Sequence, residues 1–455
     1  MLGTLIIGAG FAGLSAAETL EKRGDGSFVV LEARDRVGGR TKRGMLGDLP
    51  VDLGGMWMAP SQTELARLAE TRRVRTYPTY LDGKAIFQFG GRQRLGQREE
   101  LGPLLGLRGG IGYLLARRHL GRLMEPLDCA RPWAHPDAAR LDATTVDSWI
   151  RENIGNRLLR SAFRTVTATL FCAEPSQISL LFFLHYLKSA GGLDVLISAD
   201  EGGAQNLLFH GGLHQLSRMM AADLGQRVHL RSPIDAIEWG PGHVTARSGA
   251  RSWTARNAIV TVPPTMLDTI TFTPELPRAK MALHDRLVMG SALKFWVMYD
   301  RPFWREAGLN GTILSDEAPA TPIMDVSPPG QKRGLLVGFF DGDEAIRHAD
   351  MTRRERSRIV IDVLVAHLGE QARTPLAYLD QDWRAEEWSR GCYGAFAPPG
   401  VLSSYGAHLS APVGPIHWAG TETSDVWTGY VEGAIRSGQR AAAEVAAPNA
   451  LAISA

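Results

Sequence analysis

Residues 8–13 read Gly8-Ala9-Gly10-Phe11-Ala12-Gly13, and this stretch decides the fold. It follows a short apolar run, Leu5-Ile6-Ile7, and leads into residues 14–20, whose composition favours a helix. This strand–turn–helix context is the one in which a G-x-G-x-x-G pattern binds a dinucleotide. Gly8 makes the tight turn, Gly10 lets the backbone approach a pyrophosphate, and Gly13 lets the helix pack on the strand. The sequence therefore predicts an α/β nucleotide-binding fold.

A carboxylate follows the second predicted strand, residues 28–31. Glu32 stands nineteen residues after Gly13, where it can accept hydrogen bonds from an adenosine ribose and repel a 2′-phosphate. NADP is therefore disfavoured. Because glycine is common here, at 50 of 455 residues, a tight turn without a ligand is the alternative, and the pattern alone does not separate FAD from NAD.

Length and composition limit the class of protein. The 455 residues are too many for one ordinary core, so we expect two domains. A net charge of +2 gives no electrostatic reason to expect a nucleic-acid or membrane partner. Three scattered cysteines predict neither a disulfide framework nor a metal site. No signal peptide or membrane-spanning run is visible, so we expect a cytoplasmic protein.

The apolar patterns predict a chain that leaves the nucleotide domain twice and returns. We assign residues 1–75, 205–280 and 381–455 to that domain, and residues 76–204 and 281–380 to a second one. Residues 144–187 have helical spacing after a cap at Thr144-Thr145-Val146-Asp147, and residues 51–55 are expected to form a loop. Further strands are expected at residues 228–230, 234–237, 244–246, 258–262, 294–299 and 334–340, and the last segment reads as strand, turn and a helix from about Val431.

Seven arginines lie from Arg92 to Arg122, opposed by Glu99 and Glu100. They could form an anion-facing patch. A solvated helix face with a loop is the interpretation we prefer, because runs of like charge are usually solvated.

Several separate blocks, spread over residues 4–445, resemble the flavin amine oxidase family. They are residues 31–41 (Leu-Glu-Ala-Arg-Asp-Arg-Val-Gly-Gly-Arg-Thr), 52–55 (Asp-Leu-Gly-Gly), 293–294 with 301–304, 389–393 with 397–400, and 420–423 with 427–434. The resemblance implies a Rossmann-like FAD-binding domain interleaved with an α+β substrate domain. It implies oxidation of an amine to an imine, with O2 reduced to hydrogen peroxide. Residues 85–140 match no block.

The resemblance also implies the FAD contacts. The expected cofactor-binding residues are Gly8, Gly10, Ala12, Gly13, Glu32, Ala33, Arg34, Gly39, Arg40, Thr41, Gly54, Gly55, Met56, Trp57, Ile234, Trp383, Cys392, Gly420, Thr421, Gly429, Tyr430 and Val431.

Three residues are expected to be catalytic. The family has a lysine at the place of Lys294, which holds a water near flavin N5 and favours reaction with oxygen; an ordinary strand lysine that reaches solvent is the alternative. Tyr393 and Tyr430 match two rings that face each other before the flavin and accept the amine nitrogen. Either tyrosine could instead be ordinary core packing.

Cys392 matches the cysteine that some family members link to the flavin through a thioether. Attack needs a thiolate, and we expect the adjacent Arg390 to favour it, although the animal pattern has glycine at that position. A buried cysteine beside a non-covalent flavin is the alternative.

The substrate is expected to be an apolar alkyl, arylalkyl or cyclic amine. Amino-acid oxidases of this fold carry an arginine for the substrate carboxylate where this chain has Met56-Trp57, and a buried carboxylate without a partner is costly. Phe171 and Ile197 are expected to line the pocket. Asp200 and Glu201 could bind a polyamine or lie on a solvated loop.

Other functions remain open at this stage: a polyamine oxidase, an L-amino-acid oxidase or dehydrogenase, and, more distantly, a desaturase or a non-catalytic flavin protein. A homodimer is also expected.

Overall fold

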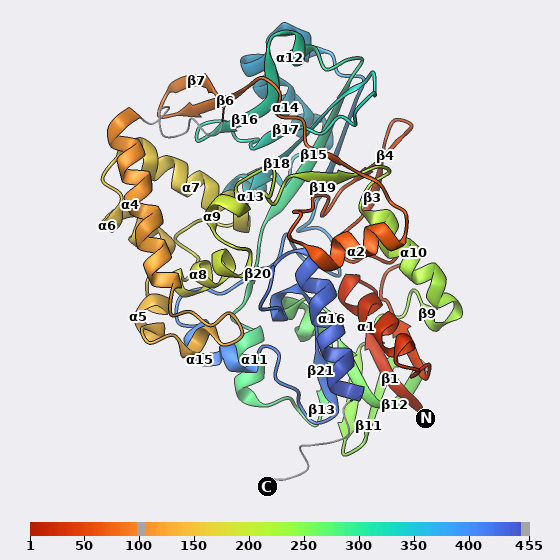
Figure 1. Cartoon of the computed structure of the whole chain (residues 1–455). Helices are drawn as coiled ribbons and strands as arrows, with labels where there is room; N and C mark the ends of the chain where they lie inside the picture. Colours follow the sequence, from red (N-terminus) through yellow and green to blue (C-terminus); the bar gives the residue numbers. More distant parts are fainter. Residues whose placement is uncertain (98–105, 447–455) are drawn as a thin grey trace.

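The computed structural model describes residues 1–97 and 106–446 and shows two large sheets with helices around them (Figure 1). The first sheet has the spatial order β13-β10-β11-β12-β1-β2-β9, and β21 also pairs with β12. Its strands are β1 (Leu2–Ile7), β2 (Phe28–Leu31), β9 (Val228–His229), β10 (Ala236–Gly240), β11 (His243–Ser248), β12 (Arg251–Val260), β13 (Thr271–Thr273) and β21 (Ile416–Trp418). The predicted α/β fold is confirmed, with its sheet assembled from three distant stretches of chain.

The first strand shows why this sheet forms. Leu5 and Ile7 point into one core and Ile6 into another, and each is almost wholly buried. This alternation is the period of two that a strand covered on both faces requires. The helices over the Ile6 face are α1 (Phe11–Lys22), α2 (Thr63–Thr71), α10 (His214–Leu224) and α16 (Val431–Ala446). The predicted final strand and helix are therefore confirmed.

The second sheet has the order β19-β15-β18-β17-β16-β6-β7. Its strands are β6 (Lys84–Phe89), β7 (Arg92–Gly96), β15 (Ala292–Tyr299), β16 (Leu309–Ser315), β17 (Ile323–Asp325), β18 (Gly334–Asp341) and β19 (Ala377–Asp382). Every residue of β15 and β18 is buried, as their apolar sequences predict. Leu293 and Phe295 lie in one core while Trp296 and Met298 lie in another, so Lys294 shares the face of Trp296.

A group of helices packs beside this sheet around a separate core. It comprises α4 (Gly106–Met124), α5 (Ala138–Ala143), α6 (Val146–Asn153), α7 (Arg157–Phe171), α8 (Leu180–Ser189) and α9 (Leu193–Leu196). The predicted cap is confirmed, because the Thr145 side chain accepts a hydrogen bond from the Ser148 amide. Residues 144–187 are mainly helical, as predicted, but they form three helices with breaks between them.

One local prediction was wrong. Residues 51–55 do not form a continuous loop, because Val51 and Asp52 belong to β4 (Leu49–Asp52), which pairs with β3 (Arg43–Leu46). The hairpin turns at Gly47, whose positive φ of 62° suits glycine. These four-residue strands carry exposed side chains and give no apolar run to detect.

The remaining elements connect the layers. They are β5 (Thr76–Pro78), β8 (Leu207–Phe209), β14 (Val288–Met289), β20 (Ala395–Phe396), α11 (Arg278–His284), α12 (Phe303–Glu306), α13 (Asp343–His348), α14 (Arg353–Leu368) and α15 (Leu402–Tyr405). Within the described residues, no helix is long and apolar enough to cross a membrane. The domain boundaries given above stay a prediction.

The arginine-rich stretch divides between β7 and α4. Arg94 and Arg118 are exposed, and Arg117 pairs with Asp194 at the surface. Arg98, with Glu99 and Glu100, lies outside the described residues. These positions are those of a solvated surface, as preferred from the sequence.

Candidate functional site

A cavity of about 540 Å³ runs from the glycine motif to the second sheet. Most of the predicted site residues line it: Gly8, Gly10, Ala12, Glu32, Ala33, Arg34, Gly39, Arg40, Thr41, Gly54, Gly55, Met56, Trp57, Ile197, Ile234, Lys294, Cys392, Tyr393, Gly420, Thr421, Gly429, Tyr430 and Val431. Segments from the first 60 and the last 70 residues thus meet around one space.

Three predicted residues do not line the cavity. Gly13 lies behind it, where a Cβ atom would meet the Gly8 carbonyl oxygen at 2.0 Å, so the residue serves helix–strand contact. Trp383 is 1% exposed and donates its indole hydrogen to the Leu53 carbonyl. Phe171 packs behind Tyr186, with ring centroids 4.5 Å apart, so Tyr186 and not Phe171 forms the wall.

The glycine-motif end fits a dinucleotide. Gly8 has a φ of 107°, and α1 begins after it with no side-chain cap and no acid in its first turn. An uncapped helix N-terminus attracts an anion such as a pyrophosphate. Glu32 is 3% exposed and accepts hydrogen bonds from the amides of Ala9 (2.8 Å) and Arg34 (3.0 Å). Its carboxylate is therefore fixed at the cavity edge, where a ribose would lie.

Arg40 joins the two ends of the chain. Its guanidinium makes two hydrogen bonds to the Glu422 carboxylate, of 2.5 and 3.0 Å, and one to the Tyr393 carbonyl. Planar two-point pairing of this kind holds both side chains rigidly. Glu422 also accepts from the Ala395 amide, so the pair positions the backbone on both sides of Gly394. Glu422 lies within a block that the sequence analysis quoted, but its role was missed.

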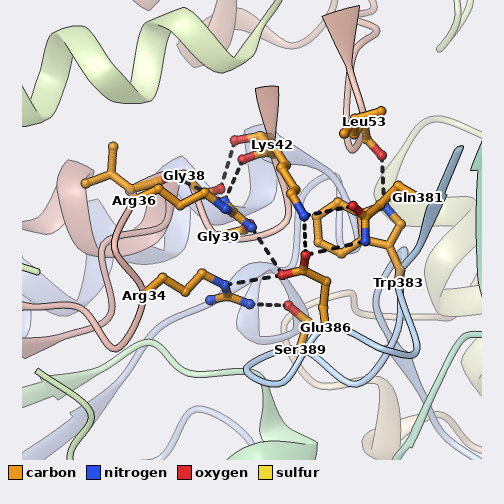
Figure 2. A network of polar contacts seen from close by, with 12 residues as sticks. Arg34, Arg36, Gly38, Gly39, Lys42, Leu53, Gln381, Trp383, Glu386 and Ser389 are labelled. Carbon is orange, nitrogen blue, oxygen red and sulfur yellow. Dashed lines mark hydrogen bonds and ion pairs between the residues drawn. The ribbon is translucent and has the colours of Figure 1, made fainter. Parts of the chain in front are cut away.

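Glu386 is the centre of a second network near the cavity (Figure 2). Its carboxylate meets Lys42 at 2.5 Å, Arg36 at 3.4 Å and Arg34 at 3.7 Å. Burial alone would raise the pKa of Glu386, but the hydrogen bond and charge of Lys42, followed by the charges of Arg36 and Arg34, hold it below its usual range. Sequence reasoning missed Glu386, because its partners lie more than 340 positions away.

The same network engages Arg34, which was expected to reach phosphate or ribose. Its guanidinium donates to the Ser389 hydroxyl at 2.6 Å and contacts Glu32 at 3.5 Å. A role toward FAD stays a prediction for Arg34 and for Arg40, because protein partners already hold both.

Lys294 lies on β15, between β19 and β18 of the second sheet, is 2% exposed and faces the cavity. Its ammonium nitrogen lies 2.7 Å from the Gly54 carbonyl and 2.9 Å from the Met56 sulfur. Burial lowers the pKa of Lys294 to about 7, while the charge of Asp52 opposes the shift. The alternative of a lysine reaching solvent is excluded by this burial.

Tyr393 and Tyr430 both line the cavity and are packed by different aromatic neighbours. Tyr393 meets Phe339 edge to face at 5.8 Å, and Tyr430 meets Trp427 edge to face at 4.9 Å. Burial raises the pKa of Tyr430 to about 12, so its hydroxyl is neutral at physiological pH. Their arrangement as a pair around an amine stays a prediction.

Cys392 lies in the cavity wall at 4% exposure. Burial raises the pKa of its thiol to about 12, and the charges of Arg40 and Lys294 oppose that rise. The prediction that Arg390 favours the Cys392 thiolate was wrong. Arg390 has a φ of 51° and turns outward, where it pairs with Asp268 at 2.8 Å. The cations near the thiol therefore come from Arg40 and Lys294.

The far part of the cavity is mainly apolar. Its wall includes Phe87, Val166, Leu196 and Met324, which the sequence analysis did not identify. Asp200 lines this space and accepts from the Ser198 hydroxyl at 3.1 Å, whereas Glu201 is exposed. Trp57 faces the cavity with a buried indole Nε1 that has no hydrogen-bond partner among the described residues. A bound group could satisfy it.

Comparison with known proteins gives consistent matches along the chain. The family described as flavin-containing amine oxidoreductase matches residues 11–446. A Mycobacterium tuberculosis protein assigned as a flavin-containing monoamine oxidase is 38% identical, over 97% of this chain and 96% of that protein. An L-amino acid dehydrogenase from Synechocystis is 35% identical, over 96% and 93%. The structure of cyclohexylamine oxidase from Brevibacterium oxydans matches with a TM-score of 0.92 and 34% identity, over 98% of each chain.

Proposed function

This chain belongs to the flavin-containing amine oxidoreductase family, and we propose that it oxidises apolar amines without an α-carboxylate, using FAD as its cofactor and O2 as the electron acceptor. It is a flavin-dependent oxidoreductase enzyme that acts on small-molecule amines. The proposal concerns the kind of amine, the form of the flavin and the acceptor.

One observation carries the proposal: a single cavity joins the glycine motif to an apolar chamber, and Lys294, Tyr393 and Tyr430 all line it. The glycine motif, the uncapped start of α1 and Glu32 suit the pyrophosphate and adenosine of FAD. The bound flavin would accept a hydride from the carbon next to the amine nitrogen. Tyr393 and Tyr430 would orient that nitrogen, whose partial positive charge favours the ring faces.

The position after Gly54-Gly55 favours an amine over an amino acid. Met56 and Trp57 occupy it, and Met56 is 3% exposed against the Lys294 ammonium. Neither side chain carries a positive charge to form an ion pair with a carboxylate, and a buried carboxylate without such a partner is costly. An apolar wall formed by residues such as Phe87 and Val166 suits alkyl, arylalkyl or cyclic groups.

Lys294 supports O2 as the acceptor. A buried ammonium beside the flavin would stabilise the negative charge that develops on oxygen as it is reduced to hydrogen peroxide. Cys392 is the candidate attachment point because it lines the cavity, and although burial raises the pKa of its thiol, the charges of Arg40 and Lys294 oppose that rise. We therefore propose that FAD is attached through Cys392.

A diamine is the second candidate substrate. Asp200 adds a carboxylate to the cavity wall, where it could meet a distal ammonium group. An L-amino acid is a third, raised by the resemblance to the dehydrogenase of Synechocystis. Apolar amines, diamines and amino acids need different partners in the cavity wall, so one panel of substrates distinguishes the three classes.

We also propose a cytoplasmic homodimer. The three cysteines are unpaired, which suits a reducing compartment. Leu107, Ile111 and Leu114 form an exposed apolar row on α4 that a second copy could bury. The mass in solution tests the dimer, and a monomer at micromolar concentration would refute it.

The test is an anaerobic screen in which amines are mixed with the flavin-loaded enzyme and bleaching of the flavin is followed. Benzylamine and cyclohexylamine should bleach it fastest, putrescine more slowly, and L-leucine hardly at all. Admission of air should then restore the yellow colour and release hydrogen peroxide. Faster bleaching by putrescine or L-leucine would replace the proposed substrate class, and recovery only with an added dye would replace O2 as the acceptor.

A further inference from the structure

Three aromatic rings lie around the ammonium group of Lys294. The nitrogen lies over each ring, 5.7 Å from the centre of the Trp57 ring, 5.6 Å from that of Trp296 and 5.7 Å from that of Phe339. The face of an aromatic ring is negative and attracts a cation within about 6 Å of its centre. These three rings, which we call the aromatic cage, therefore replace part of the stabilisation that the ammonium loses on leaving water.

The fold brings the rings of the aromatic cage from three elements. Trp296 stands two positions after Lys294 on β15, so both side chains lie on the same face of the sheet. Phe339 lies directly opposite Lys294 on the paired strand β18. Trp57 belongs to the segment that follows β4. The indole N–H of Trp296 donates to the Asp52 carbonyl at 2.9 Å, which holds this ring in place.

The contacts of the Lys294 nitrogen favour its charged form. Its hydrogen-bond partners, the Gly54 carbonyl at 2.7 Å and the Met56 sulfur at 2.9 Å, are both acceptors. An ammonium has three hydrogens to donate to such partners, whereas a neutral amine would also have to place a lone pair among them. The ring faces likewise attract the cation and give a neutral amine little. The surroundings of the nitrogen are therefore those of a binding site for a cation.

The ionisable groups near Lys294 also favour its charged form. Asp52 lies on β4 and Cys392 in the segment before β20, and a negative charge on either raises the pKa of Lys294. The residues opposite Lys294 on the two paired strands, Phe339 of β18 and Gln381 of β19, carry no charge. Burial acts against these groups and lowers the pKa of Lys294 to about 7. The aromatic cage thus acts on a group that is balanced between its two forms.

We propose that Trp57, Trp296 and Phe339 hold Lys294 as a cation in the cavity, so that the lysine acts through its positive charge and not as a base that removes a proton from the substrate. This inference rests on the proposed role of Lys294 toward O2. Trp296 and Phe339 are then positioning residues, which act on the reaction through Lys294. Trp296 is the more direct test of the two, because Phe339 lines the cavity and Trp296 does not.

The main experiment measures the charge of Lys294 by NMR of the flavin-loaded protein, with its lysines labelled with ¹³C at the ε carbon. The chain has seven lysines, and Lys294→Met identifies the signal of Lys294 by its loss. In the parent this signal should titrate near pH 7. Trp296→Leu removes one ring and should move the titration to lower pH by about 0.5 to 1 pH unit. Trp296→Phe keeps a ring but loses the hydrogen bond to Asp52, and it should titrate close to the parent.

Phe340→Leu is the matched control. Phe340 follows Phe339 on β18 and is fully buried, but it faces the other core, where its ring centre lies 5.8 Å from that of Phe295. Its variant should lose stability and leave the titration of Lys294 unchanged. Phe339→Leu should move the titration as Trp296→Leu does, and it decides the question if Trp296→Leu does not fold. An unshifted titration in either cage variant, or an equal shift in Phe340→Leu, would overturn the inference.

The rate of flavin reoxidation connects the aromatic cage to the reaction. Stoichiometric dithionite reduces the flavin without an amine, and the protein is then mixed with O2 at several pH values. The rate constant should fall as the pH rises through the titration of Lys294, and in Trp296→Leu this fall should begin at lower pH. A shift of about one pH unit lowers the ammonium fraction about fivefold at pH 7 and hardly at all at about pH 5, so the two proteins should differ only at the higher pH.

The two measurements separate this inference from the proposed function. A titration that shifts in the NMR spectrum, with no shift in the pH dependence of reoxidation, would refute the proposed role of Lys294 toward O2 and leave the cage in place. A parent in which Lys294 is already neutral at about pH 6 would refute the cage itself. The NMR titration needs neither an amine nor O2, so it decides the inference even if no amine reduces the flavin.

Discussion

At the scale of single residues, burial changes the pKa values of ionisable side chains in the cavity wall. Lys294 has a pKa near 7 because its ammonium is removed from water, and its two hydrogen-bond partners, the Gly54 carbonyl and the Met56 sulfur, carry no charge. The charged and neutral forms are then both populated around neutral pH. A lysine in this state can respond to charge that develops beside it, which a solvent-exposed lysine does weakly.

The first prediction concerns the two half-reactions. Lys294→Met should slow reoxidation of the reduced flavin by O2 at least about tenfold, because the buried positive charge is lost, and should slow anaerobic flavin reduction much less. In the parent, the reoxidation rate constant should fall as the pH rises through about 7, where the ammonium loses its proton, and the variant should show no such step. Stopped-flow absorbance at the flavin band measures both.

Lys280 supplies the matched control for that experiment. It is 1% exposed and burial lowers its pKa to about 6, but its ammonium lies on the carbonyls of His408 and Leu409, outside the cavity wall. Lys280→Met should leave both half-reactions unchanged. Equal losses in the two half-reactions of Lys294→Met would point to a role in substrate binding.

The second prediction concerns flavin attachment. Acid precipitation of the parent should leave the yellow colour in the pellet, and mass spectrometry should find the peptide of Cys392 heavier by one FAD. Cys392→Ala should release free FAD into the supernatant, because no sulfur remains to bind it, and Cys129→Ala should behave like the parent. An unmodified Cys392 peptide from the parent would contradict the proposal and leave a non-covalent flavin.

At the scale of elements, one segment ties the two sheets together. Residues 381–393 run from the end of β19 to Tyr393, and Glu386 anchors them to residues 34–42 through Lys42, Arg36 and Arg34 (Figure 2). The Glu386 carbonyl also accepts from the amides of Ser389 and Arg390. The position of Cys392 therefore depends on a carboxylate several residues before it.

The third prediction follows from that anchor. Glu386→Gln leaves three cations close together without an anion, so it should lower the free energy of unfolding by about 2 kcal/mol. This value lies between the small effect of breaking an exposed ion pair and the larger effect of breaking a buried one. The pKa of Glu386 is held down in the folded protein, so this stabilisation is complete above the pKa of an unfolded glutamate and is lost as the pH falls through the lower folded value. Denaturant unfolding at neutral pH and at about pH 3.5 should show the difference between parent and variant shrinking in acid.

Glu238→Gln is the control for the anchor. Glu238 pairs with Arg247 on an exposed surface, where both side chains are about half accessible. Its variant should change stability by well under about 1 kcal/mol at either pH. A similar small change for Glu386→Gln would mean that the three cations are adequately solvated without it.

The elements also show what the sequence could predict. Apolar runs identified β15 and β18, and the glycine pattern identified the turn into α1, because burial and backbone strain select local residue types. The hairpin of β3 and β4 left no such pattern, since its short strands are partly exposed. The network around Glu386 could not be predicted from local sequence patterns either: Arg34 bonds a serine 355 positions away, and no local spacing records such a contact. The catalytic residues were predicted from the resemblance to a family, whereas their positions around the cavity could be known only from the folded structure.

At the scale of the whole molecule, segments from both ends of the chain complete the helical layer over the first sheet. The first helix α1 and the last helix α16 lie side by side against the first sheet (Figure 1). The hydrogen bonds between Arg40 and Glu422 join the two ends of the chain a second time, at the cavity wall that Arg40 lines. The cavity wall is therefore complete only after nearly all of the chain has folded. A substitution that displaces α16 should also displace α1 and thereby change the cavity.

The last prediction tests this closure at the contact of the two helices. A Cβ atom on Gly438 of α16 would lie 2.1 Å from the Ala12 carbonyl oxygen of α1, and neither backbone can yield without moving its helix. Gly438→Ala should cost about 1 to 3 kcal/mol of unfolding free energy and should also weaken flavin binding, because α1 carries the phosphate end of the site. Gly121→Ala is the control: that glycine lies in α4 with no atom within 4 Å of a Cβ, so alanine should stabilise by up to about 1 kcal/mol and leave the flavin content unchanged. Flavin content per chain and the unfolding midpoint measure the two effects. A Gly438→Ala protein that keeps its full flavin content and stability would show that the first and last helices can separate without consequence for the site.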